Sequence, residues 1–264
     1  MLPEFALSDT ERASGQVNAA LVDEAVRKFA SQGTLILRNA FDPALIQGMH
    51  DAFIARNQRY LEDKDHADAL NVGDKRFMIT PEFEPPFDSP DVWANPTVTA
   101  IIKRLLTDQV ILGSFGAVVS LPGAEDQHIH TDFPGLFPES MLDAMLPPFA
   151  VTVVIPLVQI TELTGSTRVW PTSHRLPREK FRAVDPVGPL MAMGDCLFMD
   201  YRLVHQGAGN RSPAPRPILY NVYYRPWFRD HENYAKQARL KLSKDVYDRI
   251  PEAHRPMFVA ALRG

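Results

Sequence analysis

The sequence predicts a mainly β fold with flanking helices, built on a jelly-roll core of two packed sheets. The second half of the chain alternates short apolar, β-rich stretches with turn residues, which is typical of an all-β sandwich or barrel. The first half contains stretches with apolar residues at helical spacing. We therefore expect helices from the first half to brace a sheet formed mainly by the second half.

Length and composition favour one globular domain. The 264 residues are 45% hydrophobic and 23% charged, which are ordinary values for a folded domain. A net charge of -4 with scattered Lys and Arg argues against a nucleic-acid surface. The single cysteine, Cys196, excludes an internal disulfide and fits a reducing compartment. No apolar stretch reaches membrane-spanning length, and the N-terminus lacks a signal-peptide pattern, so we expect no membrane partner and a cytoplasmic location.

We expect a single domain over residues 1–264, in three parts. They are a helical and loop part over 1–109, a jelly-roll core over about 110–228 and a helical tail over 229–264. In the first part, helical spacing over 17–32 ends at Gly33, and 34–38 is a short β-prone run. Asp42 before Pro43 is a good N-cap for a helix that runs to about residue 60.

The stretch 61–95 has no periodicity and is punctuated by prolines. A loop this long within one domain is unusual unless it is a lid or binding loop, so we expect it to cover a binding pocket. The alternative is a surface wrap whose aromatic side chains, Phe77 among them, attach it to the core. Lys75 and Arg76 could contact an anionic group of a ligand or only solvent.

Further elements follow in order. A helix begins at Asn95-Pro96, and 110–121 reads as a strand whose Gly113 and Gly116 indicate a bulge or a close approach. A short helix is expected around 139–145, and the continuous β-branched run 149–158 predicts a strand buried on both faces. Shorter strands are expected over 190–200, 203–206 and 217–227, and an amphipathic helix over 231–242.

One motif in the second half predicts a metal site. His130 and Asp132 are two residues apart in an extended stretch, and positions two apart in a strand share a face. His205 follows a later apolar run and supplies a third donor. Two histidines and one carboxylate form the facial set of non-haem Fe(II) oxygenases, which leaves three coordination positions, two for a chelating keto-acid and one for O2. Arg216, at the start of the next strand, suits the remote carboxylate of a dicarboxylate cosubstrate.

At these residues the chain resembles the phytanoyl-CoA dioxygenase-like (PhyH) family of Fe(II)/2-oxoglutarate-dependent oxygenases. The resemblance implies a double-stranded β-helix (jelly-roll, cupin-like) core, Fe(II) held by the three predicted ligands, and 2-oxoglutarate held by arginine. The expected reaction oxidises a small molecule, such as a secondary metabolite, with release of succinate and CO2. The residues that carry the resemblance keep the family's order and spacing, and they are His130, Asp132, the segment 165–174, Gly194 with Asp195, His205 and Arg216.

The resemblance also implies further contacts to 2-oxoglutarate, from Gln127 three residues before the first ligand and from the hydroxyl of Thr167. Because related halogenases lack the carboxylate ligand, Asp132 favours hydroxylation, desaturation or another radical oxidation. By analogy to similar enzymes we expect a homodimer. The residues expected to contact the substrate are Lys75, Arg76, Phe77, Phe133 and Tyr224.

Two alternatives remain open from the sequence. His128 precedes His130 by two residues, so both side chains would lie on the same face of a strand. A cupin-type metal dioxygenase could therefore use His128, His130 and His205 without a keto-acid. A non-catalytic jelly-roll binding protein would have the same fold and no turnover.

Overall fold

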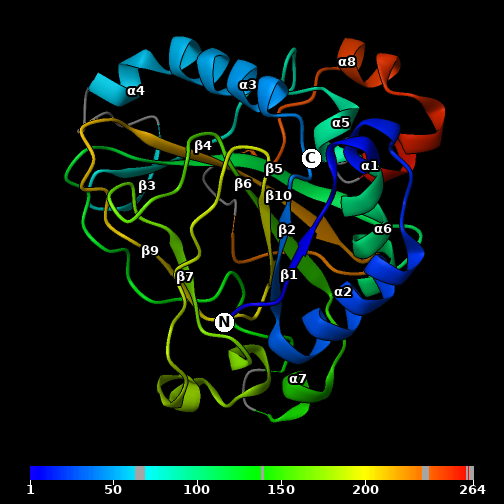
Figure 1. Ribbon diagram of the computed structural model, residues 1–264, viewed down its shortest axis with the longest axis vertical. Coiled ribbons are helices and arrows are strands. Elements are labelled where there is room, and N and C mark those ends of the chain that lie inside the picture. Colours follow the sequence, from blue (N-terminus) through cyan, green and yellow to red (C-terminus); the bar gives the residue numbers. More distant parts are fainter. Residues whose placement is uncertain (63–68, 138–139, 234–237, 260, 262–264) are drawn as a thin grey trace.

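The fold is organised around a large mixed sheet, and the computed structural model describes residues 1–62, 69–137, 140–233, 238–259 and 261. Within these residues the sheet has eight strands (Figure 1). In spatial order they are β1 (Glu4–Ala6), β2 (Thr34–Arg38), β8 (Cys196–Asp200), β6 (Ala150–Pro156), β10 (Arg216–Tyr224), β5 (Ile111–Ser120), β4 (Arg76–Ile79) and β3 (Leu70–Gly73).

A second, two-stranded sheet pairs β7 (Thr167–Val169) with β9 (His205–Gly207). Isolated bridges join further segments to this part of the molecule, among them Ala124 with Asn210 and His130 with His205. The resulting pair of sheets confirms the predicted jelly-roll core with flanking helices.

The helices begin where the sequence places capping residues. Asn18, Asp42 and Asn95 each accept a hydrogen bond from a main-chain N–H in the first turn of the helix that follows. Among the described residues, none of the helices combines the length and apolar character needed to cross a bilayer. The helices are α1 (Asp9–Ser14), α2 (Ala19–Gln32), α3 (Pro43–Arg56), α4 (Gln58–Glu62), α5 (Pro90–Trp93), α6 (Pro96–Leu105), α7 (Leu142–Met145) and α8 (Lys244–Arg249), with 3-10 turns η1 (Ser173–Arg175), η2 (Arg178–Ala183) and η3 (Glu252–Phe258).

Successive side chains along each strand point alternately into the main core and to the opposite face of the large sheet. On β10, Leu219 and Tyr223 point into the core, which is covered by α2, α3 and α6 (Figure 1). Ile218 and Tyr220 point the other way. Arg216 is two residues before Ile218, so its side chain lies on the same face of β10, away from the helices.

The stretch 61–95 divides into two parts with different roles. After the end of α4 at Glu62, it contributes the hairpin of β3 and β4 at one edge of the large sheet, and its later aromatics Phe83, Phe87 and Trp93 are buried in the main core. Residues 63–68 lie outside the described residues. The hairpin therefore carries the side chains that can reach a pocket, while the rest of the stretch packs against the core.

Two expectations about local structure differ from the fold. The predicted helix over 231–242 is wrong for its described residues, 231–233 and 238–242, and residues 234–237 lie outside the described part. The main chain there bonds to other segments instead, since the N–H groups of Phe115 and Phe83 donate to the carbonyls of Arg239 and Lys241. The stretch from 127 to 132 is extended, but none of its described residues belongs to a strand of either sheet.

Candidate metal centre

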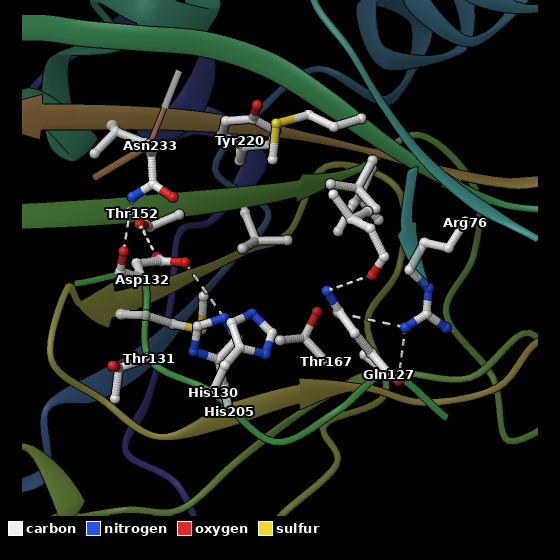
Figure 2. A pocket seen from close by; sticks show the side chains of 18 of the residues that line it. Arg76, Gln127, His130, Thr131, Asp132, Thr152, Thr167, His205, Tyr220 and Asn233 are labelled. Atoms are coloured by element: carbon white, nitrogen blue, oxygen red, sulfur yellow. Dashed lines mark hydrogen bonds and ion pairs between the residues drawn. The ribbon is translucent and has the colours of Figure 1, made fainter. Parts of the chain in front are cut away.

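A cavity of about 420 Å³ lies on the face of the large sheet away from the helices, next to the two-stranded sheet. Residues from β3 to β10 line it, together with the segment that carries His130 and Asp132 (Figure 2). The cavity therefore brings together residues that are as far apart in the sequence as Arg76 and Arg216.

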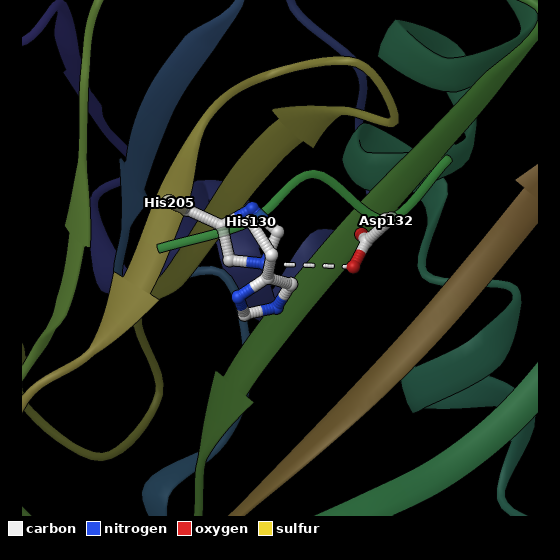
Figure 3. Close-up of side chains that lie close together, drawn as sticks. All are labelled: His130, Asp132 and His205. Carbon is white, nitrogen blue, oxygen red and sulfur yellow. Dashed lines mark ion pairs between the residues drawn. The ribbon is translucent and has the colours of Figure 1, made fainter. Parts of the chain in front are cut away.

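His130, Asp132 and His205 meet at one end of this cavity (Figure 3). One donor atom from each residue lies within 4.8 Å of the others, and Nε2 of His205 is 3.4 Å from Oδ1 of Asp132. Reciprocal main-chain hydrogen bonds hold the segments together, because N–H of His130 donates to the carbonyl of His205 at 3.0 Å and the reverse bond is 2.8 Å. The predicted donor set is therefore assembled as one group.

Main-chain hydrogen bonds orient both imidazoles. The Nδ1 atoms of His130 and His205 lie 2.8 and 3.0 Å from the carbonyl oxygens of His128 and Leu203. A carbonyl only accepts, so each Nδ1 carries the proton and each Nε2 keeps its lone pair for a ligand. Burial and the adjacent His205 lower the pKa of His130 to about 3, which keeps its ring neutral. A neutral imidazole is the form that binds a metal.

The carboxylate has its own support. The hydroxyl of Thr152, in the middle of β6, donates to Oδ2 of Asp132 at 2.7 Å and leaves Oδ1 on the side of His205 (Figure 2). Such a partner fixes the orientation of a metal-binding carboxylate. Nothing in the sequence pointed to Thr152 except that it is the one polar residue in the apolar run 149–158.

Arg216 and Arg76 are buried side by side at the other end of the cavity. Arg216 is 2% exposed and donates to the carbonyl of Gly165 at 2.6 Å, while Arg76 is 1% exposed and donates to the carbonyls of Gly207 and Ala208. Burial, and the neighbouring Arg76, lower the pKa of Arg216 to about 9, and burial lowers the pKa of Arg76 to about 10. Both guanidinium groups are therefore charged at neutral pH.

Among the described residues, no carboxylate pairs directly with these two guanidinium groups, although Asp126 and Asp74 act on Arg76 from a greater distance. Among the described residues, no Asp or Glu forms an ion pair with Arg216 or Arg76, and Nε of Arg216 has no hydrogen-bond partner. A buried charge without a counter-ion is costly, and an anion that enters from the cavity would offset that cost. The chemistry of this end of the cavity is thus that of an anion site.

The other residues expected at the site fall into two groups. Gln127 and Thr167 line the cavity, and Gln127 bonds through Nε2 to the carbonyl of Val72 at 3.1 Å. Arg76, expected to contact the substrate, also lines the cavity and lies beside Arg216. Four residues expected to contact substrate lie outside the cavity lining: Lys75 in the turn between β3 and β4, Phe77 in the main core, and Phe133 and Tyr224 in an aromatic cluster with Phe228.

His128 lines the cavity but stands apart from the donor group. Its ring centroid is 4.9 Å from that of His130, the side chain is exposed, and the group with convergent donor atoms consists of His130, Asp132 and His205. The geometry therefore supports a metal site formed by His130, Asp132 and His205, and not one that uses His128.

The jelly-roll core and the group of two imidazoles and one carboxylate define a protein of the non-haem iron oxygenase class. The model of the family described as Phytanoyl-CoA dioxygenase (PhyH) matches residues 29–218. The chain belongs to this family, as the resemblance in its sequence implies.

Named relatives are dioxygenases from fungi. Dioxygenase af480 of Aspergillus fumigatus is 29% identical over 170 residues, which are 61% of this chain and 53% of that protein. Dioxygenase FUM3 of Gibberella moniliformis is 30% identical over 114 residues, 42% of this chain and 38% of that protein. The matches thus span about half or less of each relative's length.

Solved structures share the fold. The non-heme alpha ketoglutarate dependent epimerase SnoN from nogalamycin biosynthesis aligns with a TM-score of 0.59 and 18% identity over 79% of this chain and 85% of that chain. A structure of SnoN with Fe3+, alpha ketoglutarate and nogalamycin RO aligns at 0.58 and 17% identity, over 87% and 98% of the two chains. EctD from S. alaskensis with bound Fe aligns at 0.56 and 21% identity, over 79% and 77%.

Proposed function

We propose that this chain is an Fe(II)- and 2-oxoglutarate-dependent dioxygenase that oxidises a small molecule, with release of succinate and CO2. One observation carries the proposal: a two-histidine, one-carboxylate group opens into the same cavity as two buried arginines that form no ion pair with a described carboxylate. A metal ligand set and an anion site within one cavity suit a cosubstrate that chelates a metal at one end and carries a carboxylate at the other.

The donor set fits Fe(II). His130 and His205 would bind through Nε2, since each Nδ1 is committed to a carbonyl, and Asp132 would bind through Oδ1, since Thr152 holds Oδ2. Three protein donors leave coordination positions open for cosubstrate and O2. When bound, iron and 2-oxoglutarate supply the oxidising chemistry, and the protein supplies placement and exclusion of water.

The arginine end fits the distal carboxylate of 2-oxoglutarate. Arg216 offers its unpartnered Nε, and Arg76 adds a second positive charge beside it. Thr167 and Gln127 lie in the same lining, which supports the expectation that they contact the cosubstrate. The carboxylate ligand Asp132 favours hydroxylation, desaturation or a related oxidation. A homodimer and a cytoplasmic location stay predictions from the sequence.

Anaerobic addition of Fe(II) and 2-oxoglutarate tests the proposal. The wild-type protein should develop the weak visible charge-transfer band of the chelated complex, and His205→Ala, which removes a metal donor, should lose it. Arg216→Ala should need a much higher 2-oxoglutarate concentration to develop the same band. A band that is absent from the folded wild-type protein contradicts the proposal.

Metal content and succinate release, measured in the presence of O2, separate the two alternatives. A cupin-type dioxygenase that uses His128 predicts that Arg216→Ala leaves activity largely intact and that His128→Ala removes the metal. A non-catalytic binding protein predicts no succinate under any condition that includes Fe(II), 2-oxoglutarate and O2.

A further inference from the structure

Asn233 enters the cavity from the C-terminal segment, which the sequence analysis did not connect with the site. It lines the cavity close to the metal ligands, because its amide Nδ2 donates to the main-chain carbonyl of Asp132 at 2.8 Å (Figure 2). Arg76 and Arg216 occupy the other end of the cavity. The amide therefore belongs to the part of the cavity that the cosubstrate would leave free.

Hydrogen bonds fix which way the amide faces. Nδ2 also donates to Oδ2 of Asp230 at 2.9 Å, so both of its N–H groups meet oxygen acceptors. The flipped amide would place its own oxygen against those two oxygens, which excludes that orientation. Oδ1 of Asn233 consequently points away from Asp132, and it accepts no hydrogen bond from the described residues.

Asp230 makes this placement rigid. It is fully buried, and its Oδ1 accepts from the N–H groups of Glu232 and Asn233, each at 3.0 Å. Its Oδ2 accepts from the hydroxyl of Tyr201 at 2.7 Å as well as from the amide of Asn233. Asn233 is thereby held through its main chain and its side chain, so its acceptor has a defined position.

Apart from the metal ligands and the two arginines, the lining of the cavity includes many apolar side chains. Met78, Val118 and Val222 come from neighbouring strands, and Leu70 and Val72 come from the edge hairpin. Among the described lining residues, the carboxylates and guanidinium groups are Asp132 at the metal end and Arg76 and Arg216 at the anion end. A charged substrate would find no partner here, whereas an apolar molecule with one hydrogen-bond donor would.

From these observations we propose that Asn233 is a specificity-determining residue, whose Oδ1 accepts a hydrogen bond from a hydroxyl or N–H group of a neutral, mainly apolar substrate. This inference rests on the proposed function, which assigns the arginine end to the cosubstrate. Asn233 is partly buried in the free protein, and a substrate that fills the cavity would cover its Oδ1. A substrate without a donor would then leave that acceptor unpaired, which disfavours its binding.

Matched probes test the proposal on protein loaded with Zn(II), a redox-inert ion, and 2-oxoglutarate. The probes are cyclohexanol, its methyl ether methoxycyclohexane, and cyclohexanecarboxylate, and ligand-observed NMR gives their dissociation constants. Wild-type protein should bind cyclohexanol roughly two- to tenfold more tightly than the ether, as expected for one hydrogen bond. Cyclohexanecarboxylate should bind most weakly of the three.

Two variants then locate the effect. Asn233→Leu, which has a similar size and no polar atoms, should lose the preference for the alcohol. The control is Asn71→Leu, at the other asparagine of the lining, and it should keep the wild-type preference. If Asn233→Leu does not fold, Asn233→Ser replaces it. The serine hydroxyl is too short to reach the hydroxyl of the probe, so this variant must also lose the preference for the alcohol.

The proposal is overturned if the wild-type protein binds the ether or the carboxylate as tightly as the alcohol, if none of the probes binds, or if the preference survives in the Asn233 variants. The charge-transfer band with Fe(II) and 2-oxoglutarate is recorded on the same preparations. A normal band with no preference rejects the role of Asn233 alone, and an absent band rejects the proposed function.

Discussion

Arg76 and Arg216 donate to the same hydroxyl oxygen, since Nε of Arg76 lies 2.9 Å and Nη2 of Arg216 lies 2.7 Å from Oγ of Ser120. The sheet register explains the arrangement. β5 lies between β4 and β10, and Ser120 is directly opposite Arg76 on one side and Arg216 on the other. Two like charges are thus held together by a neutral acceptor, and an anion that enters from the cavity would offset their repulsion.

The first prediction concerns the length of the keto-acid. 2-Oxoglutarate should raise the melting temperature of the metal-loaded protein, whereas 2-oxobutyrate, which chelates a metal but lacks the distal carboxylate, should raise it much less. Arg216→Gln should weaken 2-oxoglutarate binding roughly 10- to 100-fold, because a charge-assisted hydrogen bond in a buried site is lost. Differential scanning fluorimetry at several ligand concentrations gives both results.

Arg211→Gln is the matched control, since Arg211 is an exposed arginine that donates to the carbonyl of Glu162. Its response to 2-oxoglutarate should equal that of wild type. Equal stabilisation by the two keto-acids would argue against an anion site at Arg76 and Arg216.

The second prediction concerns the support of the metal carboxylate. Thr152→Val keeps the shape of the side chain but removes the hydroxyl that donates to Asp132. Metal affinity should fall roughly tenfold or more, as is typical when a partner of a ligand is removed. Mn(II) titration followed by electron paramagnetic resonance measures the change.

Thr152→Ser retains the hydroxyl and should restore most of the affinity. The side chain is nearly buried, at 4% exposed, so the melting temperature of each metal-free variant must be recorded with the titration. Unchanged affinity in Thr152→Val would mean that Asp132 holds its orientation without this hydrogen bond.

The metal ligands could be predicted from the sequence because their chemistry is local and their spacing is regular. His130 and Asp132 stand two apart, and the residue types themselves define the donor set. The helix that begins after Asp42 was predictable for the same reason, because a cap acts within one turn.

The partners of these residues could not be predicted, because they depend on strand order and register. Ser120 meets both arginines only because β5 lies between β4 and β10, which are far apart in the sequence. The predicted helix over 231–242 was wrong for a related reason. Its apolar periodicity suits a helix, but Leu240 and Leu242 pack against the main core while the main chain bonds to β5 and to Phe83.

The third prediction concerns Gly116, which the sequence marked as a point of close approach. The ring of Tyr220 lies over it, and a Cβ added to Gly116 would clash with the hydroxyl oxygen of that ring. Gly116→Ala should therefore lower the free energy of unfolding by about 1–3 kcal/mol, and it should push Tyr220 toward the cavity. Urea denaturation measures the first effect.

Gly48→Ala provides the opposite case. Gly48 is exposed in the interior of α3, and no atom lies within 4 Å of an added Cβ. The substitution should stabilise the protein by about 0.5–1 kcal/mol through helix propensity. A Gly116→Ala variant as stable as wild type would show that the Tyr220 ring moves without cost.

The last prediction concerns His174, which sits in η1 and packs against the end of α2. It is 6% exposed, its Nε2 is 3.4 Å from the carbonyl of Ala30, and its Nδ1 has no hydrogen-bond partner among the described residues. Burial lowers the pKa of His174 below its usual value of 6.5. Between pH 6.5 and that lowered pKa, the unfolded chain therefore binds a proton that the folded chain does not.

Stability must then fall as the pH drops below about 6.5, with a slope for this group of at most about 1.4 kcal/mol per pH unit. His174→Gln should show a shallower decline than wild type when urea denaturation is repeated from pH 7.5 to pH 5. His231→Gln is the control, because the His231 side chain is 70% exposed, and its slope should match wild type. An identical slope in His174→Gln would mean that the buried ring accepts a proton without penalty, which its unpartnered Nδ1 argues against.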